Sequence, residues 1–440
     1  MYLITEICLS LIGLLIYLII KYPDRSIATR SRPDINGNKG YPLIGNLISV
    51  LNNDVVLLMH CTLMEYGPVS EMWKFQRRLA SHLFRGQNFR DVICVVFEEE
   101  TKILLNILQE AAKKGDVIDL QDIFFRFTLD SFGKITFETD FGSLTNPNEP
   151  VQFAEAFDFV QTMIDKRFIN PIWPITELLT KDGAKMRSSC KYLSNYAYNI
   201  VKKRRDNEGS LKNNDILSMF MNAEINDENG NMRKLSDKEL RDIVLNLLIA
   251  GRDTTAQAIS WMMYNIMVHP DVEEKLIKEA NSSENLIPSY DEIKKFKYAH
   301  AVFHETLRLH PSVPKNNKLC IKDDVLPNGI PIHAGEWVSW SSWAMGRDER
   351  IWGKDAQKFI PDRFLENERP NQYKFNSFNC GPRICLGQNF ATVEALTVAT
   401  TILKQFKFEL LPGQKSPPDF AQSITLRMKN PLLVKVHFRQ

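Results

Sequence analysis

Apolar residues recur along most of the chain with the spacing of about 3.6 residues that is typical of amphipathic helices. Such segments lie around 89–115, 120–138, 152–168, 184–209 and 213–224. A longer helix is predicted from the Ser236…Glu239 capping box to His269 and Pro270, because a capping box marks a helix start and proline disfavours continuation. Shorter helices are expected at 270–283 and 298–309.

The pattern changes in the last third of the chain. Short runs typical of strands at 318–325 and 335–340 precede an irregular stretch rich in proline, glycine and tryptophan. A helix is predicted from Leu386 to about Gln405, and the alternating runs FKFELL and LLVKVHF near the C-terminus predict strands. The fold class indicated is mainly α with a minor β region.

The first residues form a separate apolar segment. Residues 3–20 (LITEICLSLIGLLIYLII) carry one charge, Glu6, and approach the ~20 residues that a transmembrane helix requires. Basic residues follow from Lys21 onward without the small-residue pattern of a cleaved signal peptide, which favours an uncleaved anchor with a cytosolic domain behind it. We therefore expect a signal anchor at 1–21, a linker with Pro/Gly turns at 22–46 and a catalytic domain at 47–440.

Charge and cysteine content narrow the class of protein. With 55 Lys and Arg against 53 Asp and Glu, the formal net charge is +2, which argues against nucleic acid as a partner. The seven cysteines are scattered and odd in number, which suits a reducing compartment better than a disulfide framework.

One cysteine lies in a loop suited to an anionic sulfur. Glycines flank Cys385, and a helix is predicted directly after it; a helix N-terminus favours a thiolate. For a lone cysteine, a buried structural role is the better interpretation, and Cys380 nearby raises the alternative of zinc, for which no second ligand pair is present.

The spacing FxxGxRxCxG decides between these alternatives, because it resembles the haem-binding signature of the cytochrome P450 family. Phe378, Gly381, Arg383, Cys385 and Gly387 match every defined position. The resemblance implies the cytochrome P450 fold, haem b (iron protoporphyrin IX) as cofactor and Cys385 as the axial ligand of the iron. It also implies that the other four residues bind the cofactor.

Ala250 to Thr255 (AGRDTT) resembles the motif of this family that delivers protons to bound dioxygen. The resemblance implies catalytic roles for Asp253 and Thr254, and implies that Gly251 leaves room for the cofactor. By itself the motif is weak evidence for a catalytic role, since glycine followed by threonine in a helix is usually a kink or a packing feature.

Two further motifs occur in the order that the family requires. Glu305 and Arg308, with Arg363 in PDRF, resemble its buried charge network and are assigned a structural role. Such a pair alone would ordinarily be a solvated surface bridge.

Trp73 and Arg77 resemble the family's WxxxR helix, in which both side chains meet a haem propionate. Lys318 occupies the place of another basic residue with the same purpose.

Within the family, ETLRLHPSVPKNNK and GPRICLGQNFA look most like plant and fungal fatty-acid ω-hydroxylases. This resemblance implies a monooxygenase that uses O2 on a long-chain fatty acid at the endoplasmic reticulum membrane. Electrons would come from NADPH-cytochrome P450 reductase, because the chain has no flavin or dinucleotide motif. The alternatives are an electron-independent haem-thiolate isomerase or dehydratase, and an inactive short form.

The short form is considered because family members carry two strands and two helices that are missing between Val69 and Trp73. Here Tyr66-Gly-Pro-Val-Ser70 runs directly into Glu71. The missing stretch usually supplies part of the distal pocket wall, so its absence bears on activity more than on fold.

Overall fold

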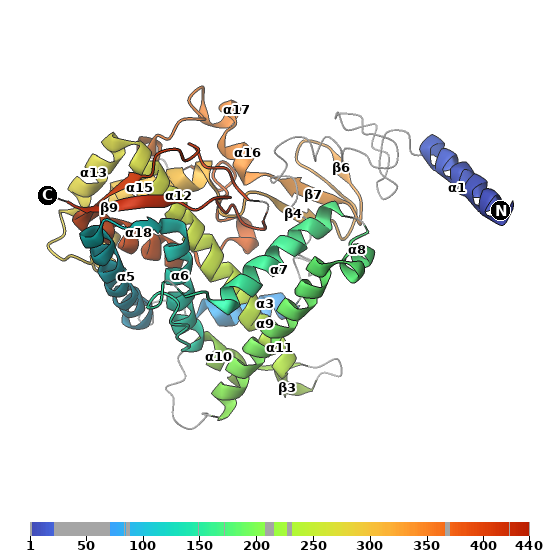
Figure 1. Ribbon diagram of the computed structural model, residues 1–440, viewed down its shortest axis with the longest axis horizontal. Coiled ribbons are helices and arrows are strands. Elements are labelled where there is room, and N and C mark those ends of the chain that lie inside the picture. The colour runs from blue at the N-terminus through green and yellow to red at the C-terminus, as the bar shows by residue number, and fades with distance from the viewer. Residues whose placement is uncertain are drawn as a thin grey trace.

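The computed structural model describes residues 2–21, 71–82, 84, 89–147, 149–170, 172–206, 215–226, 231–365, 370–421 and 423–439. The predicted linker at 22–46 and the junction after Val69 lie outside these residues. The described part is mainly helical, with small sheets (Figure 1).

The helices of the first half are α1 (Tyr2–Lys21), α3 (Glu71–Ser81), α5 (Cys94–Lys114), α6 (Leu120–Phe137), α7 (Gln152–Ile169), α8 (Trp173–Leu179), α9 (Lys181–Asp206) and α10 (Ile216–Asn222). The second half adds α11 (Asp237–Leu248), α12 (Thr254–Val268), α13 (Pro270–Ala280), α14 (Tyr290–Ile293), α15 (Lys297–Leu309), α16 (Ser342–Gly346), α17 (Glu349–Trp352) and α18 (Gln388–Gln405). The mainly α prediction is confirmed.

The N-terminal segment is helical, as its apolar run predicts. Within it, the side chains of residues 2–9 and 11 lie outside the description. Among the described residues, no helix is both long enough and apolar enough to cross a membrane.

The long helix predicted from Ser236 is present and passes through the middle of the molecule (Figure 1). Ser236 and Glu239 form the expected capping box, and α11 leads through a π-helical turn, η3 (Ile249–Asp253), into α12. Residues 255–266 of α12 are all buried, which is typical of a helix enclosed by others rather than of one lying at the surface.

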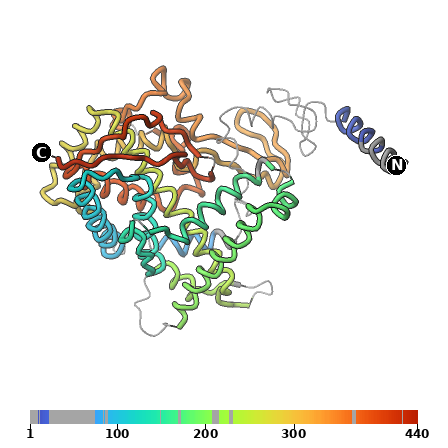
Figure 2. Tube along the Cα trace, in the orientation of Figure 1, coloured from blue at the N-terminus to red at the C-terminus, as the bar shows by residue number. Residues whose placement is uncertain are grey.

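The largest sheet joins distant parts of the chain. β9 (Leu433–Phe438) lies between β1 (Val117–Asp119) and β8 (Phe406–Leu410), and both pairs are antiparallel. β9 also lies beside α5 (Figure 2). The two tail strands were predicted; β1 is too short to have a pattern of its own.

The remaining sheets are two-stranded. They pair β2 (Glu224–Asn226) with β3 (Met232–Lys234), β4 (Asn316–Leu319) with β7 (Trp337–Trp340), and β5 (Asp324–Val325) with β6 (Pro331–Ile332). The single strand expected over 318–325 is therefore wrong. The chain turns after Cys320, because the Cys320 backbone pairs with Gly335 and Glu336 and the Asp323 carboxylate accepts from the Ala334 N–H.

Helix α18 packs against α5, α12, α13 and α15, and it buries one carboxyl. Glu394 is inaccessible to solvent and accepts a hydrogen bond of 2.5 Å from the Ser131 hydroxyl. Its Oε2 has no hydrogen-bond partner among the described residues. Burial raises the pKa of Glu394 to about 8, so the buried group holds a proton near neutral pH.

Candidate functional site

The loop that carries Cys385 is held by its own backbone. Asn379 and Gly381 adopt left-handed conformations, with φ of 64° and 61°, and Gly381 begins the short 3-10 turn η5 (Gly381–Arg383). The Cys385 N–H then donates to the Phe378 carbonyl at 2.7 Å. Gly387 is the N-cap residue of α18, so the cysteine lies two residues before the cap of that helix.

The Cys385 side chain is exposed to solvent, although neighbouring protein atoms partly desolvate it. This burial raises the pKa of the thiol above its ordinary value, while the Gly387 N–H and the Arg77 charge act in the opposite direction. The sulfur is thus accessible to a ligand. A bound cation would reverse this shift and favour the thiolate.

Three predicted cofactor-binding cations act on one another at this place. The pKa of Arg383 is lowered mainly by burial and, to a smaller extent, by the positive charge of Arg77. The pKa of Lys318 is lowered mainly by burial and, to a smaller extent, by the positive charge of Arg383. Arg77 comes from α3, Lys318 from β4 and Arg383 from the cysteine loop. The Trp73 side chain lies outside the described part of the chain, so its role remains a prediction.

The π-helical turn carries the second predicted motif. Thr254 Oγ1 donates to the Ala250 carbonyl at 2.6 Å, and the Ser312 hydroxyl donates to the Thr254 carbonyl at 2.7 Å. Gly251 packs so closely on α6 that an added Cβ would lie 2.1 Å from the Phe132 ring. This contact gives Gly251 a packing role, and its predicted contact with the cofactor stays a prediction.

Asp253 points into a network of buried charges. Its carboxylate accepts from Arg252 Nη1 at 2.9 Å and from Gln161 Nε2 at 2.5 Å. Arg252 Nη1 also donates to Asp158 at 2.6 Å, and Arg427 Nη1 donates to Asp158 at 2.7 Å. Burial raises the pKa of Asp253 despite the nearby Arg252 charge, which makes this carboxyl able to hold a proton.

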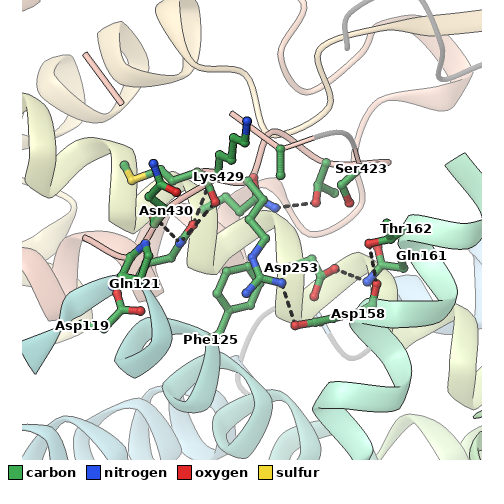
Figure 3. Close-up of a pocket in the computed structure, with 16 residues that line it drawn as sticks. Asp119, Gln121, Phe125, Asp158, Gln161, Thr162, Asp253, Ser423, Lys429 and Asn430 are labelled. Atoms are coloured by element: carbon green, nitrogen blue, oxygen red, sulfur yellow. Dashed lines mark hydrogen bonds and ion pairs between the residues drawn. The ribbon is translucent and has the colours of Figure 1, made fainter. Parts of the chain in front are cut away.

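Figure 3 shows Asp253, Gln161 and Asp158 at one wall of a cavity of about 280 Å³. The cavity lies between α6, α7, α12 and the segment 421–431, and polar side chains line most of it. The Gln161 and Gln257 carbonyl oxygens are buried there and have no hydrogen-bond partner among the residues that the structure describes. Because buried polar groups in a roomy cavity bind ordered water, the side of the long helix that holds Asp253 is suited to hydration.

Comparisons with known proteins agree with the site. The Cytochrome P450 family profile matches residues 59–436. The chain is 34% identical to Cytochrome P450 monooxygenase cyp1 of Mycosarcoma maydis, covering 96% of this chain and 78% of that protein. Alkane hydroxylase MAH1 of Arabidopsis thaliana is 32% identical, over 83% of this chain and 75% of its own length. The chain belongs to the cytochrome P450 family.

This P450 is a monooxygenase. Cytochrome P450 704B1 of Arabidopsis thaliana is a further relative, 34% identical over 84% of this chain and 78% of its own. The alignment with the fungal relative runs over 506 positions, more than the 440 residues of this chain. The relative thus has segments that this P450 lacks, and the missing segment before Trp73 stays a prediction.

The residues present fit a haem with a thiolate ligand. The accessible Cys385 sulfur can bind the iron. Arg77, Arg383 and Lys318 are suited to the two carboxylates of the porphyrin, because anions relieve the repulsion between partly buried cations.

The three residues assigned a structural role meet as expected. Arg308 Nε donates to Glu305 at 2.6 Å, and Arg363 Nε lies 3.5 Å from the same carboxylate. The Arg308 guanidinium also donates to the backbone carbonyls of Gly346, Ala356 and Lys358. This P450 therefore ties α15 to α16 and the segment 356–363 through one fully buried arginine.

Sequence reasoning missed Asp158, Gln161 and Arg427. The pattern of α7 places Asp158 and Gln161 on an ordinary amphipathic helix, and Arg427 lies 269 residues from Asp158. One signal was available: within residues 243–268 of the long helix, Arg252 and Asp253 are the only charged residues, and a buried arginine requires an acid to balance it.

Proposed function

We propose that this P450 hydroxylates a long-chain lipophilic substrate, foremost a fatty acid, with haem b bound through Cys385. The observation that carries the proposal is the accessible Cys385 sulfur at the start of α18, with three cations beside it. The substrate class is supported by the alkane hydroxylase among its relatives. It is also supported by the resemblance of ETLRLHPSVPKNNK to the fatty-acid hydroxylases.

When bound, haem supplies the iron that activates O2, and a thiolate ligand donates the electron density that favours O–O cleavage. The net reaction combines the substrate RH, O2, two electrons and two protons to give ROH and water. The protein must hold the cofactor and deliver the two protons.

Asp253 and Thr254 are suited to move these protons. The Thr254 hydroxyl donates its hydrogen to the Ala250 carbonyl, so the lone pairs of its oxygen remain able to accept a hydrogen bond from a neighbouring donor. Asp253 borders the polar cavity and can receive protons there from water. A carboxyl that exchanges protons with solvent and adjoins an acceptor hydroxyl forms a general acid relay.

The electron donor that we propose is NADPH-cytochrome P450 reductase at the endoplasmic reticulum membrane, with α1 as the anchor. The anchor proposal rests on the apolar sequence of residues 3–20 and the basic residues behind it. Alkaline carbonate extraction of expressing cells tests it: the full chain should stay in the membrane pellet, and a variant without residues 1–21 should be released. If both proteins were released, the proposal that residues 1–21 anchor the protein would be wrong.

The carbon monoxide difference spectrum of the reduced, haem-supplied protein tests the ligand. The wild type should show the strongly red-shifted Soret band of thiolate ligation, and Cys385→Ala should lose it. Cys380→Ala is the matched control, because Cys380 lies in the same loop, and it should keep the band. A thiolate band in Cys385→Ala would refute the assignment. No haem in the wild type would favour the inactive short form.

Turnover with the reductase then separates the remaining alternatives. A monooxygenase consumes O2 and NADPH in step with the hydroxylated fatty acid that it produces. An isomerase or dehydratase would convert its substrate without either, and would leave a fatty acid unchanged.

A further inference from the structure

Two carboxyls share the charge of Arg252 beside the π-helical turn. Arg252 Nη1 donates to Asp158 at 2.6 Å and to Asp253 at 2.9 Å. A second guanidinium donates to Asp158 as well, from Arg427 Nη1 at 2.7 Å. Asp158 thus receives two charged donors, whereas Asp253 receives one shared charged donor and the neutral amide of Gln161. Because charged donors favour the ionised form of a carboxyl, the two acids are not equivalent.

Exposure to solvent separates the two carboxyls further. The side chain of Asp158 is 24% exposed, and that of Asp253 is 4% exposed. Burial acts to raise the pKa of Asp158, but the charges of Arg252 and Arg427 outweigh it and lower this pKa. Burial raises the pKa of Asp253; the Arg252 charge opposes this effect, and the Asp158 charge adds to it. Two neighbouring carboxyls whose pKa values are pushed apart have different roles, since one stays charged and the other exchanges a proton.

The amide of Gln161 is suited to both protonation states of Asp253 (Figure 3). Its Nε2 donates to the Asp253 carboxylate, and its Oε1 is buried without a hydrogen-bond partner in the described part of the chain. When Asp253 takes up a proton, rotation of the amide by half a turn brings Oε1 to the new O–H group. The unpaired acceptor of Gln161 therefore has a partner in one of the two states.

The other charges next to this network are paired, bound to backbone or exposed. Such side chains line the polar cavity and an adjoining cavity of about 190 Å³: Asp119, Asp122, Arg126, Glu155 and Lys429. Asp119 accepts from two backbone N–H groups, and Asp122 pairs with Arg126 at 2.6 Å. Glu155 and Lys429 are exposed, so water and salt screen their charges. The charges that act most on Asp253 are therefore those of Arg252, Asp158 and Arg427.

We propose that Asp158 is a positioning residue of proton delivery: it stays ionised and takes up the charge of Arg252, so that Asp253 gains and releases the proton. The inference rests on the proposed function and adds to it a residue from α7, outside the AGRDTT motif. Arg427 supports Asp158 by supplying a second positive charge.

Turnover with the reductase tests this, measured as product formed per NADPH consumed across about pH 6 to 9. This coupling requires a protonated Asp253 and should fall as the pH rises. Asp158→Asn leaves the Arg252 charge to Asp253 alone, so the fall should move about one pH unit lower. Arg252→Gln should move it to higher pH. Asp158→Glu, which keeps the charge, should move it less than Asp158→Asn. The matched control is Glu155→Gln, an exposed acid one turn earlier on α7, which should not move it.

Two outcomes would overturn the proposal: an unchanged profile in Asp158→Asn, or shifts of Asp158→Asn and Arg252→Gln in the same direction. If Asp158→Asn loses the thiolate band, the double variant Asp158→Asn, Arg252→Gln is compared with Arg252→Gln. The fall should then lie at lower pH in the double variant, because the Asp158 charge no longer opposes ionisation of Asp253, and equal profiles would refute the role of Asp158. Failure of the proposed function is distinct, since the wild type would then show neither the thiolate band nor lipid oxidation.

Discussion

Two groups of buried charges in this P450 differ in what surrounds them. Arg308 is balanced by Glu305, and its guanidinium donates to several backbone carbonyls. Arg252 lies between Asp158 and Asp253, and its Nε has no hydrogen-bond partner in the described part of the chain. The first group is a closed structural lock; the second, beside a polar cavity, can exchange partners and protons. Buried pairs of arginine and carboxylate therefore serve two purposes in this protein: the first group stabilises the fold, and the second is suited to proton transfer.

The largest effect on stability is expected when the pair of Glu305 and Arg308, the structural lock, is broken. Arg308→Met leaves Glu305 buried without its main cation and should lower the free energy of unfolding by about 3–5 kcal/mol. Denaturant unfolding of purified protein measures it. Arg363→Met, whose side chain is 14% exposed, should cost less. An equal or smaller loss in Arg308→Met would contradict the lock.

The second prediction concerns the group at the cavity. Asp253→Asn removes the ionisable proton carrier and should lower kcat about 100-fold while the thiolate Soret band is retained. The measurement is reductase-supported turnover alongside the carbon monoxide spectrum. Unchanged turnover would show that protons enter by another route, and loss of the band would show that Asp253 is structural.

Glu394 shows what a buried acid does without any cation. Its folded-state pKa of about 8 exceeds the ordinary 4.5, so unfolding releases its proton whenever the pH lies between these values. The stability from this group is complete below about pH 4.5 and falls as the pH rises toward 8, by about 1.4 kcal/mol per pH unit.

Glu394→Gln should remove this slope, because glutamine keeps the shape without the proton. Unfolding of both proteins across this pH range measures the difference between them. Parallel curves would mean that Glu394 is ionised in the folded protein.

The smallest effect is expected at the outer end of the second group. Arg427 is 38% exposed at its side chain and pairs with Asp158, so water partly replaces it when it is removed. Arg427→Met should change the free energy of unfolding by less than about 1 kcal/mol. A loss as large as that of Arg308→Met would mean that the two groups are alike after all.

The sequence predicted the closed group and not the open one, for a physical reason. Glu305 and Arg308 lie one turn apart on a helix, so their contact is local and visible as spacing. Asp158 and Arg427 meet only after α7 and the C-terminal segment have packed on the long helix, and no local pattern records that. The same holds for β1, which exists because β9 pairs with it. The helices, by contrast, follow from their own periodicity.

The π-helical turn at 249–253 also makes the number of residues in this part of the long helix critical. Such a turn is equivalent to one residue inserted into an α-helix, and each residue turns a helix by about 100°. Deleting any single residue there would rewind the turn and rotate α11 against α12, so that its buried Leu240 and Val244 would face away from the core. Inherited variation at this place should therefore consist of substitutions and not of single-codon losses.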